Sequence, residues 1–205
     1  AQTPAGWCGR AGTIGAMPRP AALAFTADAD ANALLAREPL AVLIGMLLDQ
    51  QVPMEWAFNG AHTLKTRLGH LDPRKIAAMD PDEFLAVCLE KPAIHRFPKA
   101  MAQRIQGLCG IVAEKYRNKG ENIWKDVDDA QVLFERLREL PGYGEEKAQI
   151  FVALLGKRFG VQPDGWKKAA GVFSDSKPRT VARMNRWARS RCAAIHGWFA
   201  ASTTW

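Results

Sequence analysis

Apolar residues recur at three- and four-residue steps along most of the chain, the spacing that places side chains on one face of an α-helix. The strongest stripe runs from Leu40 to Leu48 and predicts a helix that ends near residues 51–53. Further stripes predict helices over 54–68, 99–116, 128–140 and from 145 to Gly156 or Gly160. No alternating pattern of useful length predicts a strand, so we expect an all-α fold.

Two Asp-Pro pairs indicate where shorter helices begin. Asp72-Pro73 and Asp80-Pro81 each put an N-capping carboxylate before a proline at the first helical position. Asp128 is likewise expected to cap the helix that follows it. The sequence therefore predicts two short helices before residue 97 and a capped helix before residue 140.

The character of the chain changes toward both ends. The first twenty residues are rich in Gly, Ala and Pro and show no helical stripe, and the region beyond Gly160 is rich in loop-forming residues. We expect a helical lobe and a second, small lobe made from two separate segments. The expected parts are a flexible leader (1–20), the helical lobe (38–157), the small lobe (21–37 with 158–190) and a frayed tail (191–205).

Amino-acid composition indicates which binding partners and which cellular compartment to expect. The chain has 28 basic and 21 acidic residues, a formal net charge of +7 that favours polyanionic partners, although many basic proteins bind none. Its four cysteines are isolated in sequence, so we expect no cysteine-ligated zinc or iron–sulfur site. Disulfides are not excluded by counting. Without a signal-peptide pattern or an apolar run long enough for a bilayer, we expect a reduced, cytoplasmic protein with no membrane association.

The segment Leu140-Pro141-Gly142-Tyr143-Gly144 separates two predicted helices. Pro141 ends the first helix, and the glycines permit positive φ and close backbone approach. The amides from Gly142 to Glu145 would begin the next helix, where unpaired N–H groups and the helix dipole attract phosphate. In the alternative interpretation the glycines merely turn the chain between two helices. Glu145 and Glu146 suit the helix dipole but repel a phosphate.

The hairpin is followed by a Lys-Ala step and an apolar helix, and Asp164 lies twenty residues after Gly144. Upstream, Leu47-Leu48-Asp49-Gln50-Gln51 ends a helix, and Lys99-Ala100 precedes another. In these features residues 38–166 resemble the HhH-GPD superfamily of base-excision repair proteins, which includes endonuclease III and the alkyladenine glycosylases. The resemblance implies a helix-hairpin-helix glycosylase fold, with a six-helix bundle and the hairpin motif at 137–155.

The resemblance also implies roles for individual residues. Asp164 corresponds to the family's catalytic aspartate, which stabilises an oxocarbenium-like sugar or orients a water, although Pro163-Asp164-Gly165 is also a plain turn signal. Bifunctional members carry a Schiff-base lysine where this chain has Glu146, and Lys147 is one residue, or about 100° of helix, away. We therefore expect no lyase activity. Glu146 is either a second carboxylate or an ordinary first-turn acid.

DNA contacts are expected from the hairpin and from the glutamine turn. Gln51 occupies the family's slot for a residue that enters the DNA stack, and Tyr143 is expected at an exposed tip where it can pack on a sugar. Arg104 and His95-Arg96 are candidate phosphate ligands or simply solvated surface. The expected DNA-binding residues are Leu140, Gly142, Tyr143, Gly144, Gln50 and Gln51. No metal site is expected beyond a monovalent cation at the hairpin carbonyls, because the family's cluster cysteines are absent.

The leading functional hypothesis is a monomeric, monofunctional DNA glycosylase acting on double-stranded DNA, in the cytoplasm or at a bacterial nucleoid. One alternative is a helix-hairpin-helix protein that binds DNA without catalysis. Another is a helical protein-interaction domain, which would not bind DNA at all.

Overall fold

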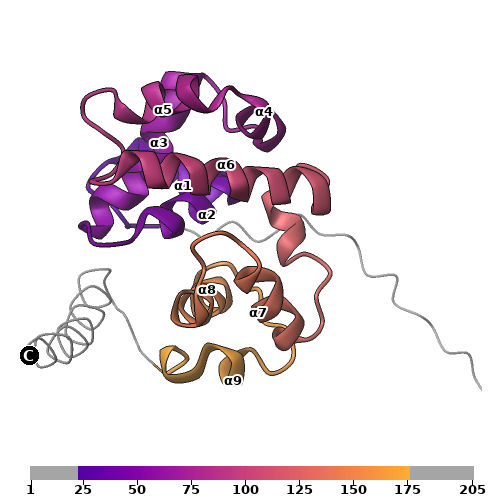
Figure 1. The fold of residues 1–205 in the computed structure, drawn as a ribbon. Coiled ribbons are helices and arrows are strands. Elements are labelled where there is room, and N and C mark those ends of the chain that lie inside the picture. The colour runs from indigo at the N-terminus through magenta and orange to yellow at the C-terminus, as the bar shows by residue number, and fades with distance from the viewer. Residues whose placement is uncertain (1–22, 176–205) are drawn as a thin grey trace, which may run out of the picture.

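The computed structural model describes residues 23–175, and over this part of the chain it is helical with no strand (Figure 1). The prediction of an all-α protein is therefore confirmed for the described residues. A single parallel bridge pairs Asp129 with Asp164. The α-helices are α1 (Ala29–Arg37), α2 (Pro39–Leu48), α3 (Met54–Leu68), α4 (Pro73–Ala78), α5 (Pro81–Leu89), α6 (Pro98–Lys115), α7 (Ala130–Arg138), α8 (Glu145–Arg158) and α9 (Trp166–Ala170), with 3-10 turns at Gly120–Ile123 and Gly171–Phe173.

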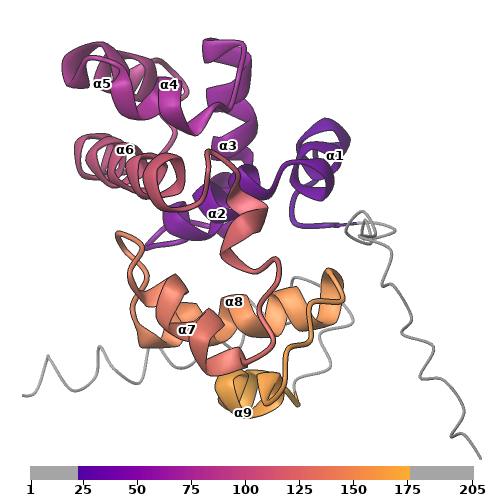
Figure 2. The same cartoon turned by 90° about the vertical axis from the view of Figure 1, so that its right-hand side faces the viewer.

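The helices form two groups that meet at α2. Figures 1 and 2 show α1 to α6 on one side and α7 to α9 on the other, linked by the segment that carries the first 3-10 turn. Every residue from Leu40 to Leu48 is buried, so α2 is covered all round rather than on one face. Buried side chains of both groups belong to one continuous core. The hairpin between α7 and α8 contributes Leu140 and Tyr143 to this core.

The helices begin at the predicted N-cap residues, except that the cap of α7 lies one residue later than predicted. The carboxylates of Asp72 and Asp80 accept amide hydrogen bonds at the starts of α4 and α5, as predicted. The cap of α7 is Asp129, whose side chain accepts from the Gln131 amide, so the prediction of Asp128 was wrong by one residue. The carbonyl of Asp128 instead accepts a hydrogen bond from the Asp164 amide at 2.7 Å.

Helix α8 continues through Gly156, one of the two residues at which we expected it to end. A Cβ atom on Gly156 would lie 2.6 Å from the indole ring of Trp166, so this glycine allows α9 to pack closely against α8. The helix ends at Arg158, and Gly160 follows with a φ of 67°. Glycine within a helical pattern here marks a packing contact rather than a terminus.

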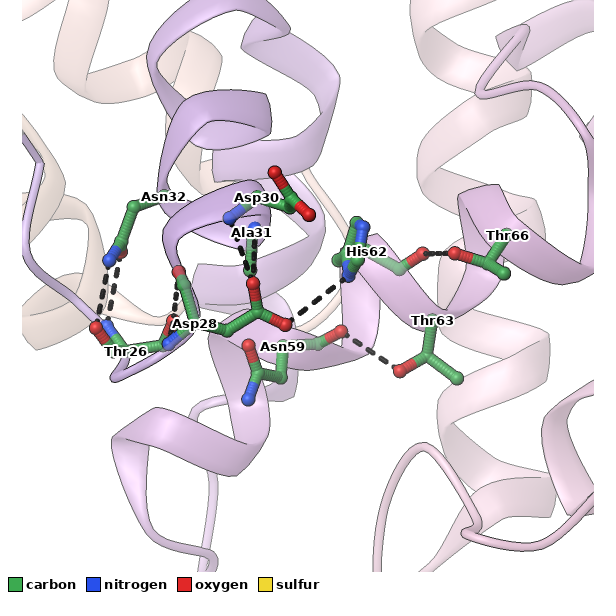
Figure 3. A network of polar contacts seen from close by, with 9 residues as sticks. All are labelled: Thr26, Asp28, Asp30, Ala31, Asn32, Asn59, His62, Thr63 and Thr66. Carbon is green, nitrogen blue, oxygen red and sulfur yellow. Dashed lines mark hydrogen bonds and ion pairs between the residues drawn. The ribbon is translucent and has the colours of Figure 1, made fainter.

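The entry into α1 is tied to α3 by the polar contacts in Figure 3. The Asp28 carboxylate accepts hydrogen bonds from the amides of Asp30 and Ala31, and it lies 3.7 Å from the imidazole of His62 on α3. These amide hydrogen bonds hold the pKa of Asp28 below its usual value. This contact fixes where α1 begins relative to α3.

Helix α1 packs within the first group of helices. Phe25 stacks on Phe58 with ring centroids 4.6 Å apart, and α1 packs on α2 and α3, because its apolar face covers theirs. Helix α9 packs on α7 and α8 instead. The predicted small lobe of 21–37 with 158–190 extends beyond the described residues and stays a prediction. The predicted leader (1–20) and tail (191–205) lie outside them.

No single helix between residues 23 and 175 is long and apolar enough to cross a bilayer, and α1 with α2 reach that length only as a pair bent by 117°. In the same range no three His, Cys, Asp or Glu side chains are grouped to hold a metal ion. Cys88 and Cys109 are free and buried, and burial raises the pKa of the Cys88 thiol to about 12. Cys8 and Cys192 lie outside the described residues.

Candidate nucleic-acid interface

The segment between α7 and α8 is a tight hairpin that presents backbone to solvent. Leu140 is buried, and its carbonyl accepts a hydrogen bond from the Tyr143 amide at 3.0 Å. Gly142 has a φ of 79°, in the left-handed region that favours glycine. Gly142 and Gly144 are both exposed. The hairpin thus offers main-chain groups, not large side chains, at its surface.

Helix α8 begins at this hairpin with unused amide donors. Gly144 is its N-cap and supplies no capping side chain, and the first hydrogen bond within the helix runs from the Ala148 amide to the Gly144 carbonyl at 3.0 Å. The amides of residues 145–147 therefore have no partner within the helix, and they lie at the positive end of its dipole. Such a terminus attracts phosphate, while the exposed carboxylates of Glu145 and Glu146 oppose it.

The hairpin packs directly on the turn that ends α2. A Cβ atom on Gly142 would lie 2.5 Å from Leu47 Cδ1, 3.4 Å from Gln50 Nε2 and 3.5 Å from Arg104 Cδ. Only glycine leaves room for these side chains to come this close to the hairpin. The structure therefore brings together the hairpin and the glutamine turn, which the sequence identified as separate features.

Tyr143 does not stand at an exposed tip, so the expectation that its side chain packs on a sugar was wrong. The residue is 4% exposed, and its hydroxyl donates a hydrogen bond to the carbonyl of Leu43 at 2.8 Å. Its ring meets Phe151 edge-on, with centroids 5.9 Å apart. Leu140, 2% exposed, is also a core side chain. Both residues support the hairpin from within, because α2 covers that side of the turn.

Replacing Tyr143 with Phe tests this placement. Removing the hydroxyl leaves one hydrogen bond unmade in the core, so the free energy of unfolding should fall by about 1 kcal/mol. Affinity for duplex DNA should stay unchanged, because the hydroxyl faces Leu43. Urea unfolding and a duplex-binding titration measure the two quantities. A clear loss of DNA affinity in a folded Tyr143→Phe protein would show that the side chain does reach DNA.

Lys147 caps the C-terminus of α2 from the facing helix. Its Nζ donates to the carbonyls of Met46, Leu47 and Asp49 at 2.7, 3.2 and 3.4 Å. These carbonyls lie at the negative end of α2, where a cation is favoured. Burial nevertheless lowers the pKa of Lys147 to about 8. Burial also raises the pKa of the Asp49 carboxyl, and the positive charge of Lys147 partly offsets that rise. The amine is engaged in the seam between α2 and α8.

The side chains of Gln50 and Gln51 differ in their hydrogen bonding. Gln50 accepts a hydrogen bond from Arg104 Nη1 at 2.8 Å and donates one to the Leu47 carbonyl at 2.7 Å. Gln51 is exposed with a φ of 56°, and no described residue bonds to its side chain. Of the two, Gln51 is the residue available to a ligand.

His95 is a structural residue of this turn rather than a surface phosphate ligand. It is 1% exposed, and burial lowers its pKa, which favours the neutral ring. The Phe97 amide donates to its Nδ1 at 3.0 Å, which leaves Nε2 to donate to the Gln50 carbonyl at 2.8 Å. The candidate phosphate ligand at His95 was therefore a wrong assignment, because the ring is used to hold the glutamine turn in place.

Two exposed aromatic side chains flank His95. Trp56 is 39% and Phe97 45% exposed, with ring centroids 6.5 and 6.0 Å from the imidazole. The guanidinium of Arg96 lies 5.3 Å from the centroid of the Phe97 ring, within cation–π range. Because His95 is bonded to Gln50, these rings lie near the turn. They offer flat apolar surface on which an unpaired base can stack.

Asp164 lies at the other end of α7 from the hairpin. Its amide and carbonyl pair with the Asp128 carbonyl and the Ala130 amide at 2.7 and 2.9 Å. The nine residues of α7 separate that bridge from the hairpin by about 13 Å of helix axis. Glu146 is exposed in the first turn of α8 and makes no ion pair with any described residue. The structure therefore does not bring Asp164 and the hairpin into contact.

Sequence reasoning gave no role to Asp49, the C-cap residue of α2. Its position directly before Gln50-Gln51 was the available signal. The site as a whole combines unpaired helix amides, a lysine in the seam, an exposed glutamine and flanking aromatic rings. Such an arrangement can hold a polyanionic backbone beside a stacked base. Comparison with protein-family models and with curated proteins gives no match for this chain.

Proposed function

We propose that this protein binds duplex DNA through the hairpin between α7 and α8, as helix-hairpin-helix proteins of base-excision repair do. The observation that carries the proposal is the close approach of the exposed Gly142 to the Leu47 and Gln50 side chains at the end of α2. Amides at the start of α8 would hold a phosphate, and Gln51 would enter the base stack. The net charge of +7 favours the same partner.

The proposed reaction is hydrolysis of the N-glycosidic bond of a damaged or mismatched base, without strand cleavage. Lyase chemistry would require a free amine that attacks the sugar, and Lys147 donates its hydrogens to three carbonyls at the C-terminal end of α2. A hydrolytic enzyme needs only a positioned water and a carboxylate. The resemblance to HhH-GPD proteins over residues 38–166 supports this chemistry, and with it the helix-hairpin-helix glycosylase fold.

A second candidate function is DNA binding without catalysis. The observation that favours it is the position of Asp164, whose backbone is bridged to the start of α7 at a distance from the hairpin. In that case Pro163-Asp164-Gly165 serves as a turn, and the hairpin alone carries the function.

Binding and product analysis test the proposal in sequence. Duplex affinity should fall steeply between about 50 and 200 mM salt, as expected when phosphate contacts release counterions. Duplexes carrying a single uracil, hypoxanthine, 3-methyladenine, 8-oxoguanine or G·T mismatch should then be assayed for released base and for strand breaks. Base release without breaks supports the glycosylase. Binding without release on every duplex supports the second candidate, and absence of salt-dependent binding would reject both.

A further inference from the structure

Arg104 of α6 lies beside the exposed backbone of the hairpin. Its Cδ atom is 3.5 Å from the position that a Cβ atom on Gly142 would take, and its Nη1 donates a hydrogen bond to Gln50 Oε1 at 2.8 Å. Helix α6 also reaches the hairpin at Gly107, where an added Cβ atom would lie 3.3 Å from Pro141 Cγ. Figures 1 and 2 both show the hairpin directly below α6. Arg104 therefore has one neighbour on the hairpin and one on the glutamine turn.

Positive charge gathers around Arg104. Burial is the main cause of the lowered pKa values of Lys147 and His95, and the charge of Arg104 lowers both pKa values further. The acid that acts on Lys147 is Asp49, whereas none of the ion pairs between residues 23 and 175 includes Arg104. Neighbouring cations repel one another, and an anionic ligand relieves that repulsion.

Arg67 shows how an arginine with a structural role is held in this protein. Its guanidinium donates to the carbonyls of Val87 and Pro92 at 2.7 and 2.8 Å, and it lies 3.6 Å from the carboxylate of Glu90. Arg104 differs, because it is half-buried and its guanidinium is held through one nitrogen by a neutral amide. An arginine has five N–H donors, so a guanidinium held in this way keeps donors for a second partner.

We propose that Arg104 binds a backbone phosphate of the DNA beside the hairpin, an inference that rests on the proposed DNA binding. Pairs of guanidinium and phosphate are charge-assisted and often bidentate, so they are stronger than hydrogen bonds from neutral N–H groups. Arg104 also supplies positive charge that offsets the carboxylates of Glu145 and Glu146 in the first turn of α8. Gln50 is a positioning residue, because its Oε1 holds Arg104 while its Nε2 donates to the Leu47 carbonyl at 2.7 Å. Such a phosphate contact adds affinity without reading sequence.

The test measures duplex affinity against salt concentration for three variants of the full chain. Arg104→Gln removes the charge and keeps a side-chain amide beside Gln50. Its affinity at low salt should fall by about tenfold or more, and the slope of log affinity against log salt should become shallower by about one, the loss of one phosphate contact. Arg104→Lys keeps the charge and should keep most of the slope. Arg104→Met keeps much of the aliphatic stem and should repeat the Arg104→Gln loss in case the amide disturbs the turn. Thermal unfolding verifies each fold.

Arg37→Gln is the matched control, because it removes the same charge from an exposed position at the end of α1. Figure 2 shows α1 and the hairpin on opposite sides of the structure. The affinity of this variant should stay within about twofold of wild type, with an unchanged slope. The inference is overturned if folded Arg104→Gln and Arg104→Met keep the wild-type affinity and slope, or if Arg37→Gln loses as much as they do. A wild-type protein without salt-dependent duplex binding would instead reject the proposed function, and the inference with it.

Discussion

Gly142→Ala should destabilise the protein by about 2 to 4 kcal/mol, which is among the largest effects expected for a one-carbon substitution in this chain. Two costs combine. The φ of 79° is strained for any residue with a Cβ, and the new methyl would lie 2.5 Å from Leu47 Cδ1. Leu47 is fully buried, so its side chain cannot move aside without disturbing the core.

Gly144→Ala is the matched control, two residues away in the same hairpin. Gly144 has a φ of −77°, and a Cβ atom added there would meet nothing within 4 Å, so only its N-cap preference is lost. That loss should cost no more than about 1 kcal/mol. Urea unfolding of both variants gives the comparison. Equal stabilities would mean that the hairpin does not pack on the end of α2 as described.

The stability of the protein should depend on pH through Lys147. The folded pKa of about 8 lies below the ordinary value of 10.5, so between these limits the unfolded chain binds more protons than the folded protein. The free energy of unfolding attributable to this group therefore rises with pH through that window. The full gain approaches about 3 kcal/mol near pH 10.5, because each pKa unit corresponds to about 1.4 kcal/mol.

Lys147→Met isolates this effect from every other titration. The methionine keeps most of the aliphatic stem but cannot ionise. The difference in unfolding free energy, wild type minus variant, should increase between about pH 8 and 10.5 and stay level below about pH 7. Urea unfolding at several pH values measures it. A difference that stays flat across the window would place the Lys147 amine in water rather than in the seam.

Much of the fold could be predicted from local pattern. The helix over 54–68 was predicted with both ends right, because Gly69 terminates it in the left-handed conformation. The Asp-Pro pairs at 72–73 and 80–81 predicted the starts of α4 and α5, since capping depends only on neighbouring residues. Helix starts and ends of this kind depend only on residues that are close together in the sequence.

The errors arose where distant segments decide the outcome. Tyr143 looks like an exposed turn residue until α2, a hundred positions away, covers it and accepts its hydrogen bond. Gly156 resembles a helix end until Trp166 packs on it. Lys147 and the end of α2 are about a hundred positions apart, and only the fold brings the amine to the carbonyls of Met46 and Leu47. The site lies between segments that are distant in sequence, so no local sequence pattern predicts that they meet.

The most direct test of the central claim is duplex binding by Gly144→Asp beside Gly144→Asn. Both side chains fit the open space at this N-cap and can cap α8, so both proteins should fold. They differ in one negative charge placed where the hairpin amides would hold a phosphate. The proposed interface predicts that the Asp variant binds at least about tenfold more weakly than the Asn variant at low salt, with the gap closing as salt rises. Equal affinities of the two variants at every salt concentration would contradict DNA binding through this hairpin.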